Sequence, residues 1–193
     1  MKISVCGIDP AMSNFGFAEA TYDTETGVID ILNLSLSETK PASKAVAKVL
    51  RKNSDDLNRA SELYESFQEI CKRSVYAFIE VPVGSQSARA MASYGMCIGI
   101  IASCPIPYFQ LNPTEVKLNA TGSKFAEKRE MIEWAVRTHP EANWLKRTVK
   151  GNVEFIAKNE HLADAVASIY AGINGKEFKQ AVAMFSVMSK LET

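Results

Sequence analysis

The stretch Gly7-Ile8-Asp9-Pro10-Ala11-Met12-Ser13-Asn14-Phe15-Gly16-Phe17-Ala18 decides the fold of this chain. The run from Lys2 to Ile8 that leads into it is short and apolar, and it predicts a buried strand. Pro10 restricts the residue before it to an extended conformation and ends the strand. The Asp9 carboxylate is therefore expected to project from the end of a sheet.

Alternating strand and helix patterns follow this first strand. Turn-forming clusters separate it from two more strands, predicted over 15–22 and 28–36, so that the chain opens with an antiparallel meander. The later elements are expected in this order: a helix over 54–73, a strand over 75–81, a helix over 87–102, a strand over 108–111, and helices over 114–118, 126–137, 159–173 and 178–188. Residues 139–156 show no clear period. This order predicts an α/β fold in which helices flank a five-stranded mixed sheet whose first three strands are antiparallel.

Length and composition indicate one globular domain. The chain has 193 residues, 47% of them apolar and 23% charged. Its longest apolar stretch, Met96 to Ile106, is shorter than the roughly 20 residues that a membrane-spanning helix needs, and no signal peptide precedes the first strand. We therefore expect a cytoplasmic protein with no membrane partner, with 1–174 as the main domain and 175–193 as a helix of that domain or of a dimer surface. The four cysteines show no metal-binding or disulfide spacing.

Charge is balanced overall but uneven along the chain. With 22 basic and 22 acidic residues the net charge is zero, which argues against coating of nucleic acid by bulk charge alone. Residues 40–73 carry eight basic and five acidic residues, and 117–150 carry eight basic and four acidic ones. Such segments are usually solvated helix faces, so they are compatible with an anionic ligand without identifying one.

Acidic residues stand where a rigid scaffold can bring them together. Besides Asp9, Glu80 lies in the apolar strand run 77–81, where an uncompensated carboxylate is costly. On the helix over 159–173, His161 and Asp164 are three positions apart and share one face. Glu160 is adjacent, and the sequence leaves open whether it belongs to the same site.

Each of these residues also has an ordinary structural interpretation. Asp9-Pro10 is a common turn, Glu80 can be a satisfied buried acid, and His161 can decorate a surface helix. Their coincidence at strand ends and on one helix face favours a shared site instead. Three carboxylates and one imidazole form the oxygen-rich ligand set that suits Mg²⁺ or Mn²⁺ in a two-metal phosphodiester site.

These residues resemble the motifs of the RuvC-type Holliday junction resolvases of the RNase H-like superfamily. The stretch at 7–18 is similar to the family's opening GIDPG motif, Phe78-Ile79-Glu80 to its second acidic strand, and 161–167 to its D/H-x-x-D-A-x-A motif. Val116-Lys117 and Ala126-Glu127-Lys128 resemble its two lysine-bearing positions near the scissile phosphate, and the helix over 87–102 resembles one that helps form the dimer interface. The likeness runs in order from residue 3 to about 174.

The resemblance implies an RNase H-like fold and a Mg²⁺-dependent endodeoxyribonuclease of DNA recombination and repair. Asp9, Glu80, His161 and Asp164 would bind two Mg²⁺ ions, for which Mn²⁺ would substitute. One ion would activate water, and the other would steady the leaving 3′ oxygen. Lys117 and Lys128 would neutralise charge on the phosphate. The substrate would be a four-way DNA junction, cut by paired symmetric nicks, and its symmetry implies a homodimer.

Departures from the family pattern concern the substrate more than the chemistry. Ala11 replaces the usual glycine after Asp-Pro, and His161 stands where many members have aspartate. Val83 stands where some members place an aromatic wedge, which favours structure-selective over strongly sequence-selective cutting. Lys117 and Lys128 are also candidate DNA contacts. Six more basic residues are candidate DNA contacts that can equally be read as solubilising surface residues: Arg89, Lys124, Arg129, Lys146, Arg147 and Lys150.

Three alternatives stay open at this point. An ATP-handling enzyme of the actin and sugar-kinase type shares the Gly-Ile-Asp opening, but that fold needs two such domains and a glycine-rich adenosine motif that 193 residues do not offer. A non-catalytic junction- or RNA-binding relative would be expected to lack one of the acids, and all four positions are filled here. Another RNase H-like nuclease, acting on forks, flaps or RNA–DNA hybrids, would use the same metal site.

Overall fold

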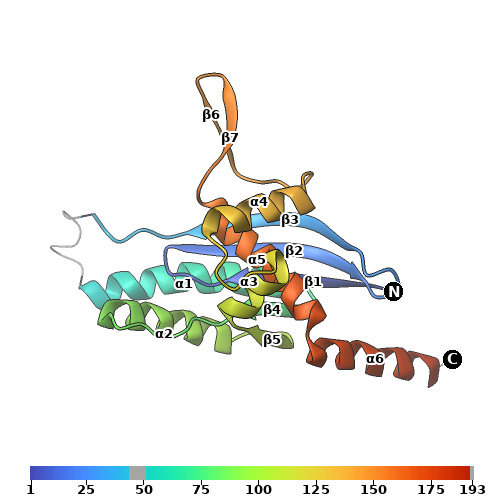
Figure 1. The fold of residues 1–193 in the computed structure, drawn as a ribbon. Coiled ribbons are helices and arrows are strands. Elements are labelled where there is room, and N and C mark those ends of the chain that lie inside the picture. Colours follow the sequence, from blue (N-terminus) through green and yellow to red (C-terminus); the bar gives the residue numbers. More distant parts are fainter. Residues whose placement is uncertain (44–50, 192–193) are drawn as a thin grey trace.

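A mixed five-stranded sheet organises the chain (Figure 1). The computed structural model describes residues 1–43 and 51–191. The sheet has the order β3-β2-β1-β4-β5, with β1 (Lys2–Asp9), β2 (Asn14–Asp23), β3 (Ile29–Glu38), β4 (Tyr76–Glu80) and β5 (Tyr108–Leu111). β1, β2 and β3 pair antiparallel, β4 runs parallel to β1, and β5 runs parallel to β4. The predicted sheet, including its antiparallel opening meander, is confirmed.

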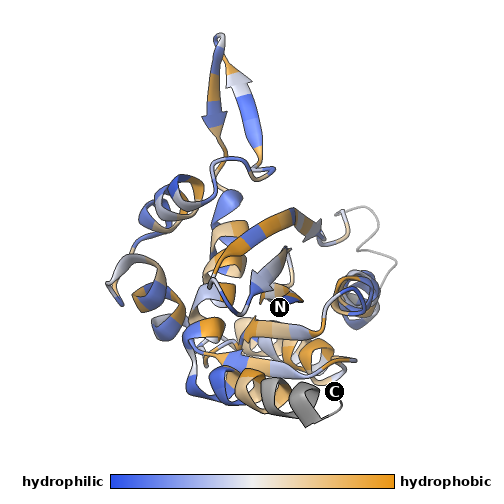
Figure 2. Cartoon of the chain, turned by 90° about the vertical axis from the view of Figure 1, so that its right-hand side faces the viewer, coloured by the Kyte–Doolittle hydropathy of each residue, from blue (hydrophilic) through white to orange (hydrophobic). Residues whose placement is uncertain are grey.

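Helices cover both faces of this sheet. One face packs against α1 (Lys52–Cys71) and α2 (Ala88–Ala102). The other packs against α3 (Pro113–Thr121), α4 (Lys128–Thr138), α5 (Asn159–Asn174) and the start of α6 (Lys176–Leu191). Two apolar cores result, one on each side of the sheet. Hydrophobic residues (orange) follow the central strands (Figure 2). Successive side chains of a strand point to opposite faces, so a sheet covered on both faces needs apolar residues at successive positions.

Residue alternation along β1 decides which face each side chain meets. Cys6 and Ile8 lie in the core under α1 and α2, whereas Ile3 and Val5 lie in the core under α5. Because the period of a strand is two, Gly7 and Asp9 belong to the α5 face. Helix α5 lies along that face (Figure 1).

Two glycines of the opening stretch let α5 lie unusually close to the sheet. A Cβ placed on Gly7 would stand 2.0 Å from the carbonyl oxygen of Ala165, and one on Gly16 would stand 2.3 Å from that of His161. Neither distance is compatible with any side chain. These glycines of the opening stretch therefore set the depth at which the helix carrying His161 packs on β1 and β2.

The elements after the sheet differ from prediction mainly in their ends. α3 extends beyond the predicted 114–118 because the Asn112 side chain caps its first turn and Glu115 returns the bond, and it ends at Gly122, whose φ is +77°. The unassigned stretch 139–156 contains an antiparallel hairpin of β6 (Lys146–Val149) and β7 (Asn152–Phe155). Part of the basic stretch 40–73 lies outside the described residues. No described helix has the length and apolar content needed to cross a bilayer.

Candidate active site

Two predicted site residues end adjacent parallel strands. β1 and β4 pair from Val5 opposite Tyr76 to Ile8 opposite Ile79, so the next positions along the two strands are Asp9 and Glu80. Tyr76 and Phe78 of β4 lie in the core under α5, and Glu80 shares their face by the same alternation. Both carboxylates therefore lie at one edge of the sheet, on the side covered by α5.

The first turns of α5 bring the other two predicted residues to this edge. The Nδ1 of His161 lies 2.7 Å from Oδ2 of Asp9, and the two side chains are only 18% and 14% exposed. Asp164, one turn further along α5, is a partly buried acid on the same face. Gly16, which pairs with Asp9 across β1 and β2, is the residue on which the His161 backbone rests.

Burial and neighbouring carboxylates raise the pKa values of two acids of the site. Burial, and then the charges of Asp9 and Asp164, raise the pKa of Glu80 to about 8. Burial, and then the charge of Asp9, raise the pKa of Asp164 to about 7. Lys117 on α3 acts in the opposite direction on both acids. The partly buried Lys117 is therefore close enough to neutralise part of the charge of this site.

Glu160 joins the site to the second predicted lysine. The Nζ of Lys128, at the start of α4, lies 2.8 Å from one carboxylate oxygen of Glu160, and this hydrogen bond raises the pKa of Lys128. The other oxygen of Glu160 lies 3.4 Å from Nε2 of His161. Burial disfavours the charged imidazole, but hydrogen bonding to Asp9 and the surrounding acids outweigh it, so the pKa of His161 is raised. Glu160, which the sequence left unassigned, thus links Lys128 to His161.

The predicted DNA contacts are scattered, and some have partners within the chain. Both terminal nitrogens of Arg89 lie 2.5–2.6 Å from the carboxylate of Asp56 on α1. Arg129 pairs with Glu133 one turn away on α4. The Nζ of Lys124 lies 5.0 Å from the centre of the Phe125 ring, an aromatic side chain that is 80% exposed.

A buried arginine supports the turn that follows Asp9, and sequence reasoning did not identify it. The Arg59 guanidinium donates to the carbonyl oxygen of Met12 at 3.0 Å and to Oγ1 of Thr39 at 3.0 Å. It also lies 3.6 Å from Asp56, which Arg89 binds. The i, i+3 spacing of Asp56 and Arg59 on α1 predicts an ion pair between them. The sequence does not predict that Arg59 also contacts the turn after Asp9.

The donor chemistry of this site fits a divalent cation. Among the residues that the structure describes, no three acidic, histidine or cysteine side chains stand close enough together to enclose an ion as they are now oriented. The raised pKa values of Glu80 and Asp164 nevertheless reflect carboxylates that are partly withdrawn from water and insufficiently compensated by Lys117. Hard oxygen ligands in this situation suit Mg²⁺ or Mn²⁺.

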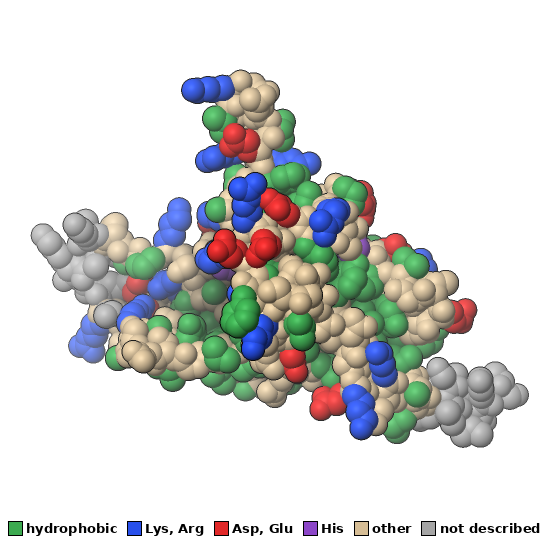
Figure 3. All heavy atoms as spheres, in the orientation of Figure 1, with side chains coloured by type: hydrophobic (Ala, Val, Ile, Leu, Met, Phe, Trp, Pro, Cys, Tyr) green, Lys and Arg blue, Asp and Glu red, His purple; other side chains and the backbone are tan. Residues whose placement is uncertain are grey.

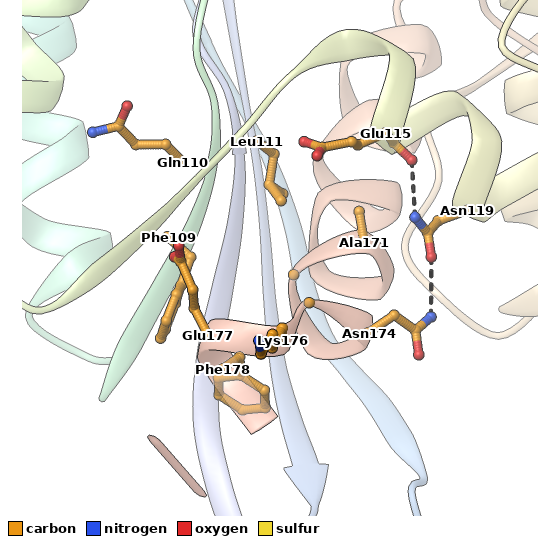
Figure 4. Close-up of a pocket in the computed structure, with 12 residues that line it drawn as sticks. Phe109, Gln110, Leu111, Glu115, Asn119, Ala171, Asn174, Lys176, Glu177 and Phe178 are labelled. Carbon is orange, nitrogen blue, oxygen red and sulfur yellow. Dashed lines mark hydrogen bonds between the residues drawn. The ribbon is translucent and has the colours of Figure 1, made fainter. Parts of the chain in front are cut away.

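Two hollows of the structure differ in their distance from the site. One, of about 220 Å³, opens beside the site and is lined by Asp9, Pro10, Ala11, Glu80, Pro82, Val83, Tyr94 and Pro113. The other, of about 340 Å³, lies between β5, α3 and the junction of α5 with α6, where Asn119 and Asn174 are hydrogen-bonded (Figure 4). It contains none of the predicted site residues. Of these two hollows, the first is the one that reaches Asp9 and Glu80.

Comparison with known proteins identifies the fold. No family model and no curated protein sequence matches the chain. Among solved structures, it is similar to Thermus thermophilus RuvC in complex with a Holliday junction substrate (TM-score 0.60, 18% identity, covering 88% of this chain and 92% of RuvC). It is also similar to Fowlpox virus resolvase in complex with Holliday junction DNA (TM-score 0.52, 15% identity, covering 89% and 99%). The chain has the RNase H-like fold that these resolvases share, as its motifs predict.

Proposed function

We propose that this chain is a structure-selective endodeoxyribonuclease that resolves four-way DNA junctions by paired symmetric nicks. One observation carries the proposal: His161 is hydrogen-bonded to Asp9 at the sheet edge where burial and the charge of Asp9 raise the pKa values of both Glu80 and Asp164. Its support is the likeness of the fold to two resolvases solved with Holliday junction DNA. Fold alone does not specify a reaction, so the acidic site is the stronger part of the case.

The side chains of the chain itself have distinct roles in this chemistry. Asp9, Glu80, His161 and Asp164 would hold two Mg²⁺ ions, which supply Lewis-acid stabilisation of the phosphodiester and an activated water. Lys117 reduces the negative charge around Glu80 and Asp164 and would neutralise charge that develops on the phosphate. Lys128 is 80% exposed beyond its contact with Glu160, so it can turn toward a phosphate at the mouth of the site.

An exposed apolar stripe on α2 supports a homodimer. Met91, Gly95, Ile98 and Gly99 all face solvent, at spacings that place them on one side of the helix. The space above both glycines is open to at least 4 Å, so another backbone can approach closely. A contiguous apolar surface of this kind is typical of an interface. Two copies related by a two-fold axis would present two sites to the two equivalent strands of a junction.

Cleavage of branched DNA tests the proposal directly. A labelled synthetic four-way junction, a linear duplex and an RNA–DNA hybrid are incubated with the chain in Mg²⁺ or in EDTA. We expect paired, Mg²⁺-dependent nicks in the junction only, with a phosphate on each new 5′ end.

Each other result identifies a different protein. Cutting of the hybrid would assign the chain to another RNase H-like nuclease, and cutting of forks or flaps in preference to junctions would change its substrate. Tight junction binding without cutting would make it a binding module. If the chain neither binds nor cuts the junction, the proposal is refuted.

A further inference from the structure

The β6–β7 hairpin stands away from the rest of the molecule (Figure 1). Its register pairs Lys146 with Phe155 and Val149 with Asn152, leaving the two-residue turn Lys150-Gly151 at the tip. Both turn residues have positive φ, 50° at Lys150 and 85° at Gly151, as a two-residue hairpin turn of the favoured twist requires.

Lysine at the first turn position is unfavourable for the backbone. Among the described residues, Lys150 is the non-glycine residue with a positive φ, and asparagine, aspartate or glycine would adopt that conformation more easily. The hairpin thus places a long cationic side chain at its outermost point although the turn itself favours other residues. An outlier of this kind points to a role for the side chain outside the fold.

The strands of the hairpin lie almost entirely in solvent. All residues of both strands are exposed except the partly buried Val149, and the apolar Val153 and Phe155 are 67% and 44% exposed. Apolar and polar residues alternate along β7, and no other element covers either side of the hairpin in Figure 2. A two-stranded hairpin with both faces in water is marginally stable, so it is expected to have a partner surface.

The base of the hairpin is fixed to the helix that carries the candidate site. Asn159, the fully buried first residue of α5, accepts from the backbone N–H of Leu145 at 2.9 Å and donates to its carbonyl oxygen at 2.8 Å. The N–H of Ile156 closes the base by donating to the same carbonyl at 3.3 Å. Since His161 follows Asn159 by two residues, a partner held by the hairpin would be held beside the site.

The charge of the hairpin identifies the kind of partner. Residues 146–155 contain three basic residues and one acidic residue, Glu154. Arg147 pairs with Glu154 at 3.2 Å, whereas Lys146 lies over the Phe155 ring at 5.4 Å from its centre. Lysine and arginine side chains are visible at the tip and at the base in Figure 3. This excess of positive charge complements a polyanion.

We propose that the β6–β7 hairpin binds the sugar–phosphate backbone of one duplex arm of the branched DNA, next to the candidate site. This inference rests on the proposed function and adds a binding element to it. Lys150 and Lys146 contact phosphates, so the interaction is independent of sequence and weakens with salt. The fixed base orients that arm relative to Asp9 and His161.

The test compares two pairs of charge-removing substitutions. Lys146→Gln with Lys150→Asn removes two hairpin charges, and asparagine preserves the positive φ at the turn. Lys176→Gln with Lys179→Gln removes two exposed charges on α6, which lies at the other end of the molecule (Figure 1). Binding of a fluorescent four-way junction in EDTA is measured between 50 and 300 mM salt, and unfolding curves verify that both variants are folded.

We expect the hairpin variant to bind the junction roughly 10-fold more weakly at low salt, with a salt dependence reduced by one to two ions, and the α6 variant to match the native chain. Cleavage at subsaturating protein should fall together with the affinity, because the hairpin holds the DNA arm beside the site. Lys150→Asp changes the charge by the same two units at the tip alone and should also weaken binding without disturbing the turn.

Three outcomes would overturn the inference or its premise. If the native chain binds and cuts junctions but the hairpin variant has the same affinity and salt dependence, the hairpin inference fails while the proposed function stands. If the variant changes the sedimentation of the free protein without changing DNA affinity, the hairpin is a contact between copies. If the native chain neither binds nor cuts junctions, the proposed function itself fails.

Discussion

His161 on α5 and Asp9 at the end of β1 are joined by a 2.7 Å hydrogen bond across 152 residues of sequence. A carboxylate only accepts hydrogen bonds, so the Nδ1–H of His161 donates to Asp9, whose neighbours are also acids. This bond connects the first strand with the last helix of the core, and Gly16 permits it by letting the His161 backbone approach β2.

Replacing Asp9 by asparagine is expected to abolish cleavage and spare junction binding. The substitution keeps the shape of the side chain but removes a negative charge from the site, and losing about 4 kcal/mol of transition-state stabilisation lowers a rate about 10³-fold. Binding depends mainly on phosphate contacts elsewhere and should change by less than about threefold. Gel-based cleavage and binding assays measure both quantities. The exposed acid-to-amide change Glu25→Gln is the control, and equal loss of binding and cleavage in a folded Asp9→Asn variant would contradict the assignment.

Replacing Glu80 by glutamine is expected to stabilise the metal-free protein. The pKa of Glu80 is raised from its ordinary value of 4.5 to about 8, so this residue favours folding less and less as the pH rises from 4.5 toward 8. In EDTA at pH 8 the variant should therefore unfold at a higher temperature than the native chain. Its free energy of unfolding should be higher by a few kcal/mol at most. Mg²⁺ should stabilise the native chain and have little effect on the variant.

Thermal unfolding with and without Mg²⁺ distinguishes this prediction from a general ion effect. The exposed Glu65→Gln substitution on α1 serves as the matched control and should respond to Mg²⁺ as the native chain does. Equal stabilisation of Glu80→Gln and the native chain by Mg²⁺ would show that Glu80 is not a ligand.

Much of this site follows from local sequence signals. Asp9 is identified by the proline after it, Glu80 by its position in an apolar strand, and the shared helix face by the spacing of His161 and Asp164. Strand alternation then places the acids on one face of the sheet. These signals are local, so a single sequence contains them.

The features that sequence reasoning did not find depend on contacts between distant segments. The hairpin shows no period because both of its faces are exposed, and burial is what produces a period. The sequence identifies Arg89 only as a basic residue that can lie on the surface. The packing of α2 on α1 brings it to Asp56. The link from Lys128 to Glu160 likewise requires α4 to lie against α5.

Gly16→Ala is expected to displace the start of α5 and destabilise the protein. The added Cβ would meet the His161 carbonyl at 2.3 Å, so the helix must shift, at a cost of roughly 3 kcal/mol. The hydrogen bond between His161 and Asp9 would lengthen, and cleavage should fall with stability. Gly84→Ala, at a glycine with open space around it, is the control. Denaturant unfolding measures the free energy of unfolding of both variants. Equal values would contradict the close packing of α5.

The two histidines are expected to affect acid stability in opposite directions. Burial lowers the pKa of His139, which bonds Tyr170 at 2.9 Å, so its contribution to stability falls as the pH drops below about 6.5. The pKa of His161 is raised, so its contribution is present below 6.5 and is lost as the pH rises through the folded-state value.

Urea unfolding between pH 5 and 7.5 in EDTA tests this difference with single variants. His139→Asn should reduce the loss of stability on acidification, and His161→Asn should increase it. If the slope of unfolding free energy against pH changes in the same direction in both variants, the two rings do not have opposite environments.

Ile98→Glu is expected to convert a dimer into a monomer. Ile98 is 46% exposed in the middle of the α2 stripe, and a carboxylate there would have to be buried without a partner if two copies packed through this face. Sedimentation should show the native chain at twice its mass of 21.2 kDa and the variant at that mass. Leu32→Glu, at a residue 65% exposed on β3, is the matched control and should remain dimeric. Because one copy has one site, the variant should also produce unpaired single nicks in a junction, whereas paired nicks from a monomeric variant would show that resolution does not require this interface.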